Sequence, residues 1–284
     1  AQALVTNSVI PGTVDYTITP TASSCVGVPI VVNVTVNPTP EVFGSAGTVI
    51  CSGESTNIIL SPKILGTDFT WTVVQNGVTG AEDGGGGNTI DQILEAGTTV
   101  GTAAYTITPI LNGCTGESIT IVITVNPSPQ PELEDGIICV EEATNTTYKN
   151  YVLDTGLSDS LYDFNWFKES VKIDGASAST YEATAEGLYS VIVTNTLTSC
   201  ISEEVFATVI PNYPAESLTT TVTDAFTPEA TITVNPLGGT GPFLYRLDDG
   251  PLQSSNVFVG VSSGVHTVWV EDGQGCTQLS REVT

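Results

Sequence analysis

The stretch VDYTITPTASSCVGVPIVVNVTVNPTP, at Val14–Pro40, decides how this chain is organised, because a similar stretch recurs later in the chain. It aligns without a gap with AAYTITPILNGCTGESITIVITVNPSP at Ala103–Pro129, at a constant offset of 89 residues. That offset exceeds the repeat length of solenoid proteins, about 20 to 50 residues, and matches a small independent domain. The repeat therefore predicts an array of separate domains.

Each copy of the repeat ends in an alternation of apolar and polar residues. In the second copy Ile119, Ile121 and Ile123 fall on one face, whereas Thr120 and Thr124 fall on the other. A period of two is typical of a β-strand with one buried face. Only 13% of the residues are charged, and the abundant Thr, Val and Gly favour strands and turns. We therefore expect an all-β fold with almost no helix.

Proline-rich stretches set the expected domain boundaries. Prolines follow the two Val-Asn motifs of the repeat, and Pro-Asn-Tyr-Pro lies at Pro211–Pro214; such stretches form extended connectors. We predict four segments, at residues 1–38, 39–127, 128–211 and 212–284. The first matches only the second half of the complete segment at residues 39–127, so we expect it to be half of a β-sandwich from a longer array, unable to fold alone.

Residues 128–211 resemble an immunoglobulin fold. Phe164-Asn165-Trp166 resembles the strand that supplies the core tryptophan, and Ala185–Val191 resembles the tyrosine corner around Tyr189. In the last segment Ser263–Val270 aligns with Glu186–Val193, which gives His266 the place of the corner tyrosine. We therefore expect tandem immunoglobulin-like sandwiches.

The charge of the chain excludes some partners. It carries 31 acidic and 6 basic residues, a formal net charge of −25. Nucleic acid needs clustered basic residues, and an anionic membrane would repel this surface. No stretch resembles a signal peptide or a membrane span. Since methionine is absent, we expect a processed or excised piece of a longer protein.

The six cysteines contain no CxxC pair, which excludes a zinc ribbon and a thioredoxin-like motif. They lie near the starts and ends of the predicted segments, as structural disulfides do in an oxidising, extracellular setting. We predict two disulfides within domains, Cys51–Cys114 and Cys139–Cys200. We expect Cys25 and Cys276 to be unpaired.

Two motifs suggest catalysis or phosphate binding, and we interpret both as structural. Gly260–Gly264 fits GxSxG, but a nucleophile elbow leads into a helix, whereas His266–Val270 has the pattern of a strand. The glycine run Gly84–Gly87 follows two acids and precedes no lysine, so it lacks the features of a phosphate loop. We expect a flexible loop tip there and no enzyme activity.

Two further features are candidate binding sites. The acidic turns Asp248–Gly250 and Glu271–Gly273 have oxygen ligands suited to calcium, although Asp-Gly is also a common hairpin turn. Calcium is the one cofactor considered, and the ordinary turn is the favoured interpretation. Trp269 is predicted to point outward on its strand, where an aromatic ring could stack on a sugar. It is our candidate ligand contact.

Several motifs together resemble surface proteins of Bacteroidota. CSGES at Cys51–Ser55, the YTITP motifs and VTVNPTP are similar to PKD-like domains. Tyr151–Glu169 resembles the immunoglobulin-like unit of those proteins, and Gly241–Thr277 resembles the SprB repeat of gliding-motility adhesins. The resemblance makes residues 1–38 half of a PKD-like domain, 39–127 a PKD-like domain, 128–211 an immunoglobulin-like domain and 212–284 a SprB-repeat-like domain.

The resemblance implies a very long adhesin, exported by the type IX secretion system to the cell surface. Its partners would be neighbouring domains, the secretion and gliding machinery, and extracellular polysaccharide. This bacterial group is known for O-glycans at Asp-Ser/Thr followed by a small or aliphatic residue, and Asp159-Ser160-Leu161 is similar to that signal. It implies a glycan on Ser160.

We therefore expect a rod-like stalk segment of a surface adhesin for attachment or gliding. Two alternatives remain open. One is a glycan-binding module, which requires an exposed aromatic groove. The other is the non-catalytic tail of a secreted enzyme.

Overall fold

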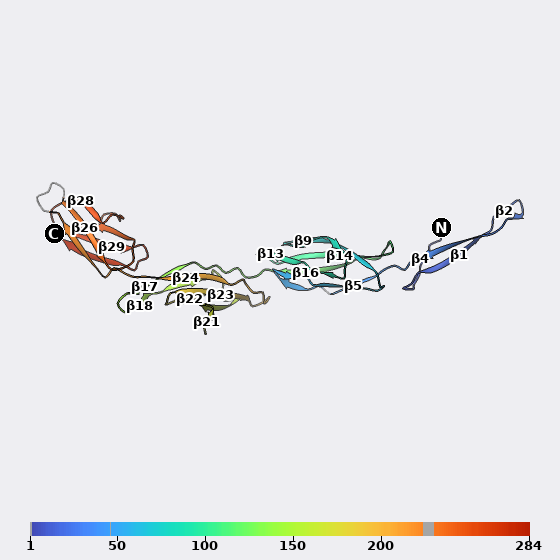
Figure 1. Ribbon diagram of the computed structural model, residues 1–284, viewed down its shortest axis with the longest axis horizontal. Coiled ribbons are helices and arrows are strands. Elements are labelled where there is room, and N and C mark those ends of the chain that lie inside the picture. Colours follow the sequence, from blue (N-terminus) through green and yellow to red (C-terminus); the bar gives the residue numbers. More distant parts are fainter. Residues whose placement is uncertain (1, 46, 224–229) are drawn as a thin grey trace. The chain divides into compact units, whose positions relative to one another are not determined.

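The computed structural model describes residues 2–45, 47–223 and 230–284, and its ordered elements are all strands (Figure 1). It divides into two compact units, Ala1–Ser128 and Pro129–Thr284. The predicted fold class, a tandem array of immunoglobulin-like and PKD-like β-sandwiches, is confirmed.

The N-terminal element of the first unit is a two-stranded ribbon. Strand β1 (Gly12–Ile18) pairs antiparallel with β4 (Ile30–Val36), and a small hairpin of β2 (Thr21–Ala22) and β3 (Cys25–Val26) extends from them. Gly12 is opposite Val36. The same register recurs between Gly101 and Val125 in the second copy of the repeat. The sequence repeat is thus a repeat of strand pairing.

The second copy of the repeat is part of a complete sandwich. One sheet contains the repeat and is ordered β11 (Gly84–Gly85), β9 (Asp68–Asn76), β14 (Gly101–Leu111), β16 (Ile119–Asn126) and β6 (Val49–Cys51), with β15 (Cys114–Thr115) pairing with β14. Two small sheets lie opposite: β5 (Val42–Gly44), β8 (Ile58–Pro62) and β12 (Thr89–Ile90), and β7 (Glu54–Ser55), β13 (Ile93–Ala96) and β10 (Val78–Thr79).

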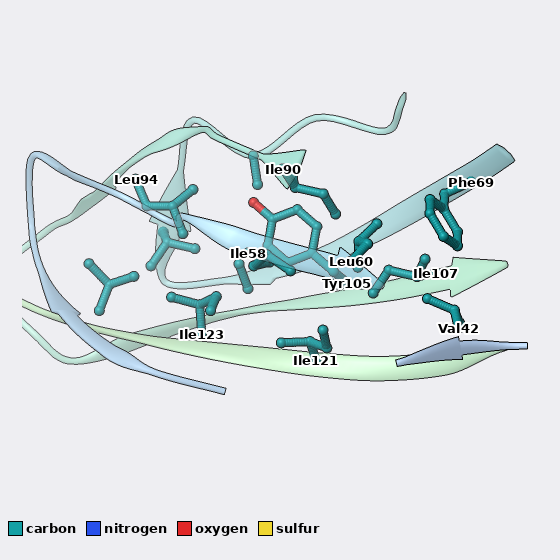
Figure 2. Close-up of a cluster of buried hydrophobic side chains, with 14 residues drawn as sticks. Val42, Ile58, Leu60, Phe69, Ile90, Leu94, Tyr105, Ile107, Ile121 and Ile123 are labelled. Atoms are coloured by element: carbon teal, nitrogen blue, oxygen red, sulfur yellow. The ribbon is translucent and has the colours of Figure 1, made fainter. Parts of the chain in front are cut away.

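The core of this sandwich lies between its layers (Figure 2). The predicted alternation in β16 is confirmed, because Ile121 and Ile123 are buried and Thr120 is exposed. Tyr105 of the YTITP motif is fully buried, and its hydroxyl donates a hydrogen bond to Gln92 Oε1 at 2.7 Å. Burial raises the pKa of Tyr105 to about 12. In this copy the motif lies on β14, the middle strand of the main sheet.

The second unit begins with an immunoglobulin-like sandwich. Its main sheet is ordered β18 (Thr146–Lys149), β17 (Gly136–Glu141), β24 (Val205–Asn212), β23 (Gly187–Asn195), β20 (Tyr162–Lys168) and β21 (Val171–Lys172). Facing it are β19 (Tyr151–Asp154) and β22 (Thr180–Ala183).

The predicted core tryptophan and tyrosine corner are both present. Trp166 is fully buried on β20, and its indole N–H donates to the Ala178 carbonyl at 2.9 Å. The Tyr189 hydroxyl donates to the Ala185 carbonyl, four residues earlier, at 2.8 Å. Each ring thus fills apolar space while its one polar group is satisfied, as buried Trp and Tyr require.

The last sandwich comprises two three-stranded sheets around a core of its own. One contains β25 (Ser217–Val222), β26 (Ala230–Leu237) and β28 (Val257–Val261), and the other contains β27 (Phe243–Leu247), β29 (His266–Asp272) and β30 (Gln278–Val283). Val268 and Val270 of β29 are buried.

In the two larger sandwiches the first strand of the main sheet runs parallel to its last strand. Strand β6 pairs with β16, which puts Cys51 opposite Asn126. Strand β17 pairs with β24, which puts Cys139 opposite Asn212. Each first-strand cysteine therefore lies at the end where the chain leaves the sandwich.

This parallel pairing explains why the predicted disulfides Cys51–Cys114 and Cys139–Cys200 are wrong. Cys114 and Cys200 both precede the last strand, so they lie toward its opposite end. A strand of eight residues is about 25 Å long, whereas bonded cysteines need Cα atoms within about 7 Å. Instead Cys139 bonds Cys276 and Cys114 is a free thiol.

The expectation that Cys276 is unpaired is therefore wrong too. Cys25 is a free, exposed thiol. Cys51 and Cys200 are not free.

The aromatic core gives the first testable prediction. Replacing Trp166 by Ala leaves a large cavity and should lower the free energy of unfolding of the second unit by about 3–5 kcal/mol. Tyr189→Phe removes one hydrogen bond and should cost about 1 kcal/mol. Urea unfolding followed by circular dichroism measures both. Val171→Ala, at a side chain 70% exposed, is the matched control. An equal loss of unfolding free energy in all three variants would contradict the roles of Trp166 and Tyr189 in the core.

Candidate functional site

The most constrained site in the second unit is the junction between its two sandwiches. A disulfide joins Cys139 of β17 to Cys276, in the turn between β29 and β30, with Cα atoms 5.4 Å apart. Both cysteines are buried. Because the two residues are 137 apart in sequence, the disulfide encloses most of both sandwiches. We call this junction the clamp.

Hydrogen bonds surround the disulfide on both sides. The Tyr148 hydroxyl donates to the Cys276 carbonyl at 2.7 Å, and Lys149 Nζ donates to the Gln274 carbonyl at 2.8 Å. On the connecting segment, the Ala215 amide donates to Thr277 Oγ1 at 3.0 Å. The clamp is thus a polar interface as well as a covalent bond.

Asp272 holds the turn of the clamp in shape. Its Oδ1 accepts from the amides of Gln274 and Cys276, and its Oδ2 accepts from the Thr277 amide and Asn212 Nδ2. Burial alone would raise the pKa of Asp272, but these hydrogen bonds outweigh it and lower the pKa below its usual value. Both oxygens of this acidic turn are occupied by N–H donors, so this carboxylate serves the turn rather than a cation.

His266 forms a second corner, as the alignment predicted. Its Nε2 lies 2.9 Å from the Ser262 carbonyl, four residues earlier, in the same relation as Tyr189 to Ala185. Its Nδ1 lies 2.7 Å from Asp248 Oδ2. Both ring nitrogens face acceptors, so both are donors and the imidazolium form fits best. The bond to Asp248 and that to Ser262 raise the pKa of His266, and the bond to His266 lowers the pKa of Asp248.

This corner brings Ser262, the middle residue of GxSxG, into line with His266 and Asp248. Ser262 Oγ is 3.5 Å from His266 Nε2. A catalytic histidine must accept the serine proton on Nε2, but here Nε2 donates to the Ser262 carbonyl. The residue after the motif also leads into strand β29, as the sequence predicted. Ser262, His266 and Asp248 are the residue types of a catalytic triad, but their hydrogen bonds hold a structural corner.

Trp269 points outward, with 39% of its surface exposed. Its cross-strand partner is Arg246, whose guanidinium carbon lies 5.1 Å from the ring centroid. This cation–π contact covers part of the ring. The role of Trp269 as a ligand contact stays a prediction.

The glycine run differs from its predicted form. Gly84 and Gly85 form strand β11 and pair with β9, so this part is not a flexible loop tip. A Cβ on Gly84 would meet the Trp71 ring at 2.6 Å, which explains why glycine is needed. Gly86 and Gly87 follow with positive φ angles, as in a turn.

One sequence motif remains, the candidate glycosylation site at Ser160. Ser160 is exposed in the turn before β20, with its hydroxyl 2.9 Å from that of Ser158. Its position suits modification, and the glycan itself stays a prediction. No group of three or more histidine, cysteine or acidic side chains suited to a metal occurs within residues 2–45, 47–223 and 230–284. The described part of the chain also has no helix that could span a membrane.

Comparison with known proteins finds a family model that matches part of the chain. Residues 1–40 and 48–129 match the model of the PKD-like domain family. No curated protein matches the chain. Among solved structures, the FN1–FN3 domains of chicken CNTN1 are 10% identical, with 86% of this chain and 97% of that chain covered and a TM-score of 0.32.

Two other solved structures are similar at the same level. The Ig1–2 module of the Drosophila receptor protein tyrosine phosphatase DLAR is 15% identical, with 61% of this chain and 99% of that chain covered and a TM-score of 0.22. Domains A168–A170 of titin are 9% identical, with 83% of this chain and 94% of that chain covered and a TM-score of 0.35. The PKD-like match, the β-sandwiches and the disulfide together indicate an extracellular type of module, without evidence of an enzyme family.

The His266 corner predicts an unusual pH dependence. A raised pKa in the folded state means that the stabilisation is fully present below about pH 6.5, the ordinary pKa of histidine, and is lost as the pH rises through the folded value. We expect the last sandwich to unfold at lower temperature at pH 8 than at pH 6. His266 is the only histidine, so the transition is attributable to it.

His266→Tyr is the matched variant, because a tyrosine hydroxyl can donate to the Ser262 carbonyl without titrating near neutral pH. It should remove the difference between pH 6 and pH 8 and keep the fold. Calorimetry at both pH values measures this effect. Equal melting temperatures for the wild-type chain would refute the imidazolium assignment.

Proposed function

We propose that this chain is a load-bearing stalk segment of a secreted cell-surface adhesin that serves attachment or gliding. The observation that carries the proposal is the clamp, because it joins successive sandwiches covalently. Tension that enters before Cys139 and leaves after Cys276 passes through the sulfur–sulfur bond. The 137 residues of separation are thereby protected from extension. A module built for ligand binding alone has no need of such a connection.

The surface composition supports the same proposal. A net charge of −25 keeps neighbouring copies apart and resists adsorption to anionic surfaces. Export by the type IX secretion system, and partners in the gliding machinery or in extracellular polysaccharide, are the finer parts of the proposal. They rest on the resemblance of the motifs. A glycan on Ser160 would shield the turn before β20.

Single-molecule extension tests the load-bearing role. In the oxidised chain, held at its two termini, the residues between Cys139 and Cys276 should not lengthen at forces that unfold β-sandwiches. Full reduction should release at least the enclosed segment, and 137 residues correspond to roughly 450–490 Å of extended chain. If the oxidised chain extends as far as the reduced chain at the same force, the proposal is overturned.

A pair of serine variants separates the clamp from general effects of thiols. Cys276→Ser should increase the extension of the oxidised chain, because it opens the clamp. Cys25→Ser should leave the extension unchanged, because Cys25 is a free thiol. If both variants behave alike, the disulfide does not carry the load.

A glycan-binding module is the second candidate, and the outward-facing Trp269 beside Arg246 favours it. An exposed ring with a hydrogen-bonding neighbour suits a sugar. Binding of the chain to a glycan array should then be lost in Trp269→Ala and retained in Phe206→Ala, a control at another half-exposed aromatic side chain. An array without any bound glycan would remove this candidate and leave the stalk proposal unaffected.

A further inference from the structure

The ribbon of β1 and β4 has an apolar face that its sequence counterpart buries. Ile18 and Val32 are 51% and 41% exposed. The equivalent residues at the offset of 89, Ile107 and Ile121, are 0% and 4% exposed. The two strand pairs are similar in sequence and have the same register, so the difference lies in what covers them.

The long edges of the ribbon also differ from those of its counterpart. In the complete sandwich the β14–β16 pair has a neighbour on each side. Strand β9 pairs antiparallel with β14, and β6 pairs parallel with β16. The ribbon is a two-stranded sheet with no such neighbours among the described residues. A single element, the first half of a PKD-like unit, would therefore complete the face and both edges at once.

We propose that the β1–β4 ribbon is a docking site for the first half of another PKD-like unit, a segment of the type of residues 41–89. A strand like β9 would add antiparallel to β1, and a strand like β6 would add parallel to β4. Alternate apolar residues, as at Phe69 and Trp71, would then cover the face around Ile18 and Val32. Main-chain pairing would give affinity, and the alternating side chains would give specificity.

The charge pattern fits this occupant. Between Gly12 and Val36 the ribbon carries one charged residue, Asp15, which accepts a hydrogen bond from Asn33 Nδ2 at 2.6 Å. An acidic segment such as residues 41–89 therefore meets little repulsion. A second copy of this chain fits less well, because its own first half already covers Tyr105 and Ile123.

The free thiol of Cys114 extends the docking site. In the second unit the turn next to Cys276 contacts Ala215, three residues after Asn212, and Cys276 bonds Cys139 opposite Asn212. In the first unit the turn after Cys114 contacts Pro40, since a Cβ on Gly116 would overlap the Pro40 carbonyl. Pro40 likewise lies three residues after Asn37, the equivalent of Asn126.

The docked first strand would place its own cysteine, equivalent to Cys51, opposite Asn37 and beside Cys114. The two thiols would each lose a proton and together give up two electrons to form the disulfide. Oxidised glutathione takes up those electrons and protons and becomes two molecules of reduced glutathione. The docked half would thus be clamped to the next sandwich, as Cys139 is to Cys276.

The test is the full chain with an additional copy of residues 41–89 fused directly ahead of Ala1, refolded in a glutathione buffer. Hydrogen exchange should slow at least about 100-fold for the amides of Val14 and Val32 relative to the unfused chain. Peptide mapping should link the copied Cys51 to Cys114. The amides of β14 and β16 are the internal reference for folding in both chains.

Two variants control for unspecific effects. Val32→Asp should abolish the protection in the fused chain but leave the unfused chain unchanged, and Val31→Asp, on the opposite face, should leave the protection intact. If the amides of Val14 and Val32 stay unprotected in the fused chain while those of β14 and β16 are protected, the proposal is overturned. A dimer of the unfused chain by sedimentation, with the same amides protected, would assign the face to a second copy instead. A Cys25–Cys114 bond would overturn the proposed disulfide between the copied Cys51 and Cys114.

Discussion

The parallel pairing of the first strand with the last strand is the constraint on which the arrangement of this protein depends. It brings the start of each larger sandwich to the end where the chain leaves it. Cys139 is then within reach of the sandwich that follows it, whereas both first-strand cysteines are out of reach of the hairpin of their own domain. The covalent connection between sandwiches, the buried Asp272 turn and the proposed path of tension all follow from that placement.

Corner residues show how one architectural need is met by different chemistry. Tyr189 and His266 each donate to a carbonyl four residues earlier at the start of an inner strand. The tyrosine is insensitive to pH in the physiological range, since its burial raises its pKa further. The histidine needs Asp248 to hold its second proton, so the last sandwich gains a titrating group where its neighbour has none. This corner also explains why a serine, a histidine and an aspartate meet without forming a catalytic site.

The two copies of the repeat form a comparison within one chain. Identical register and similar side chains give a buried core in one copy and an exposed ribbon in the other. Local sequence thus specifies the hairpin, whereas burial depends on strands that come from elsewhere in the chain. A β-sandwich is stable only when both layers are present, which is why the proposed docking site calls for a complementary half.

The sequence by itself determined the all-β fold, the inward faces of the strands and the residues of both corners. These features depend on period-two patterns and on contacts between residues close in sequence, such as Tyr189 with Ala185. It also showed that the GxSxG motif leads into a strand. The sequence did not determine the disulfide pairing, the formation of strand β11 by Gly84 and Gly85, or the role of Asp272. Cys139 and Cys276 are 137 residues apart, and the single cysteine of the last segment was the only signal for a bond between domains. Only the tertiary structure decided that pairing, because strand direction within a sheet, rather than distance along the chain, determines which cysteines meet.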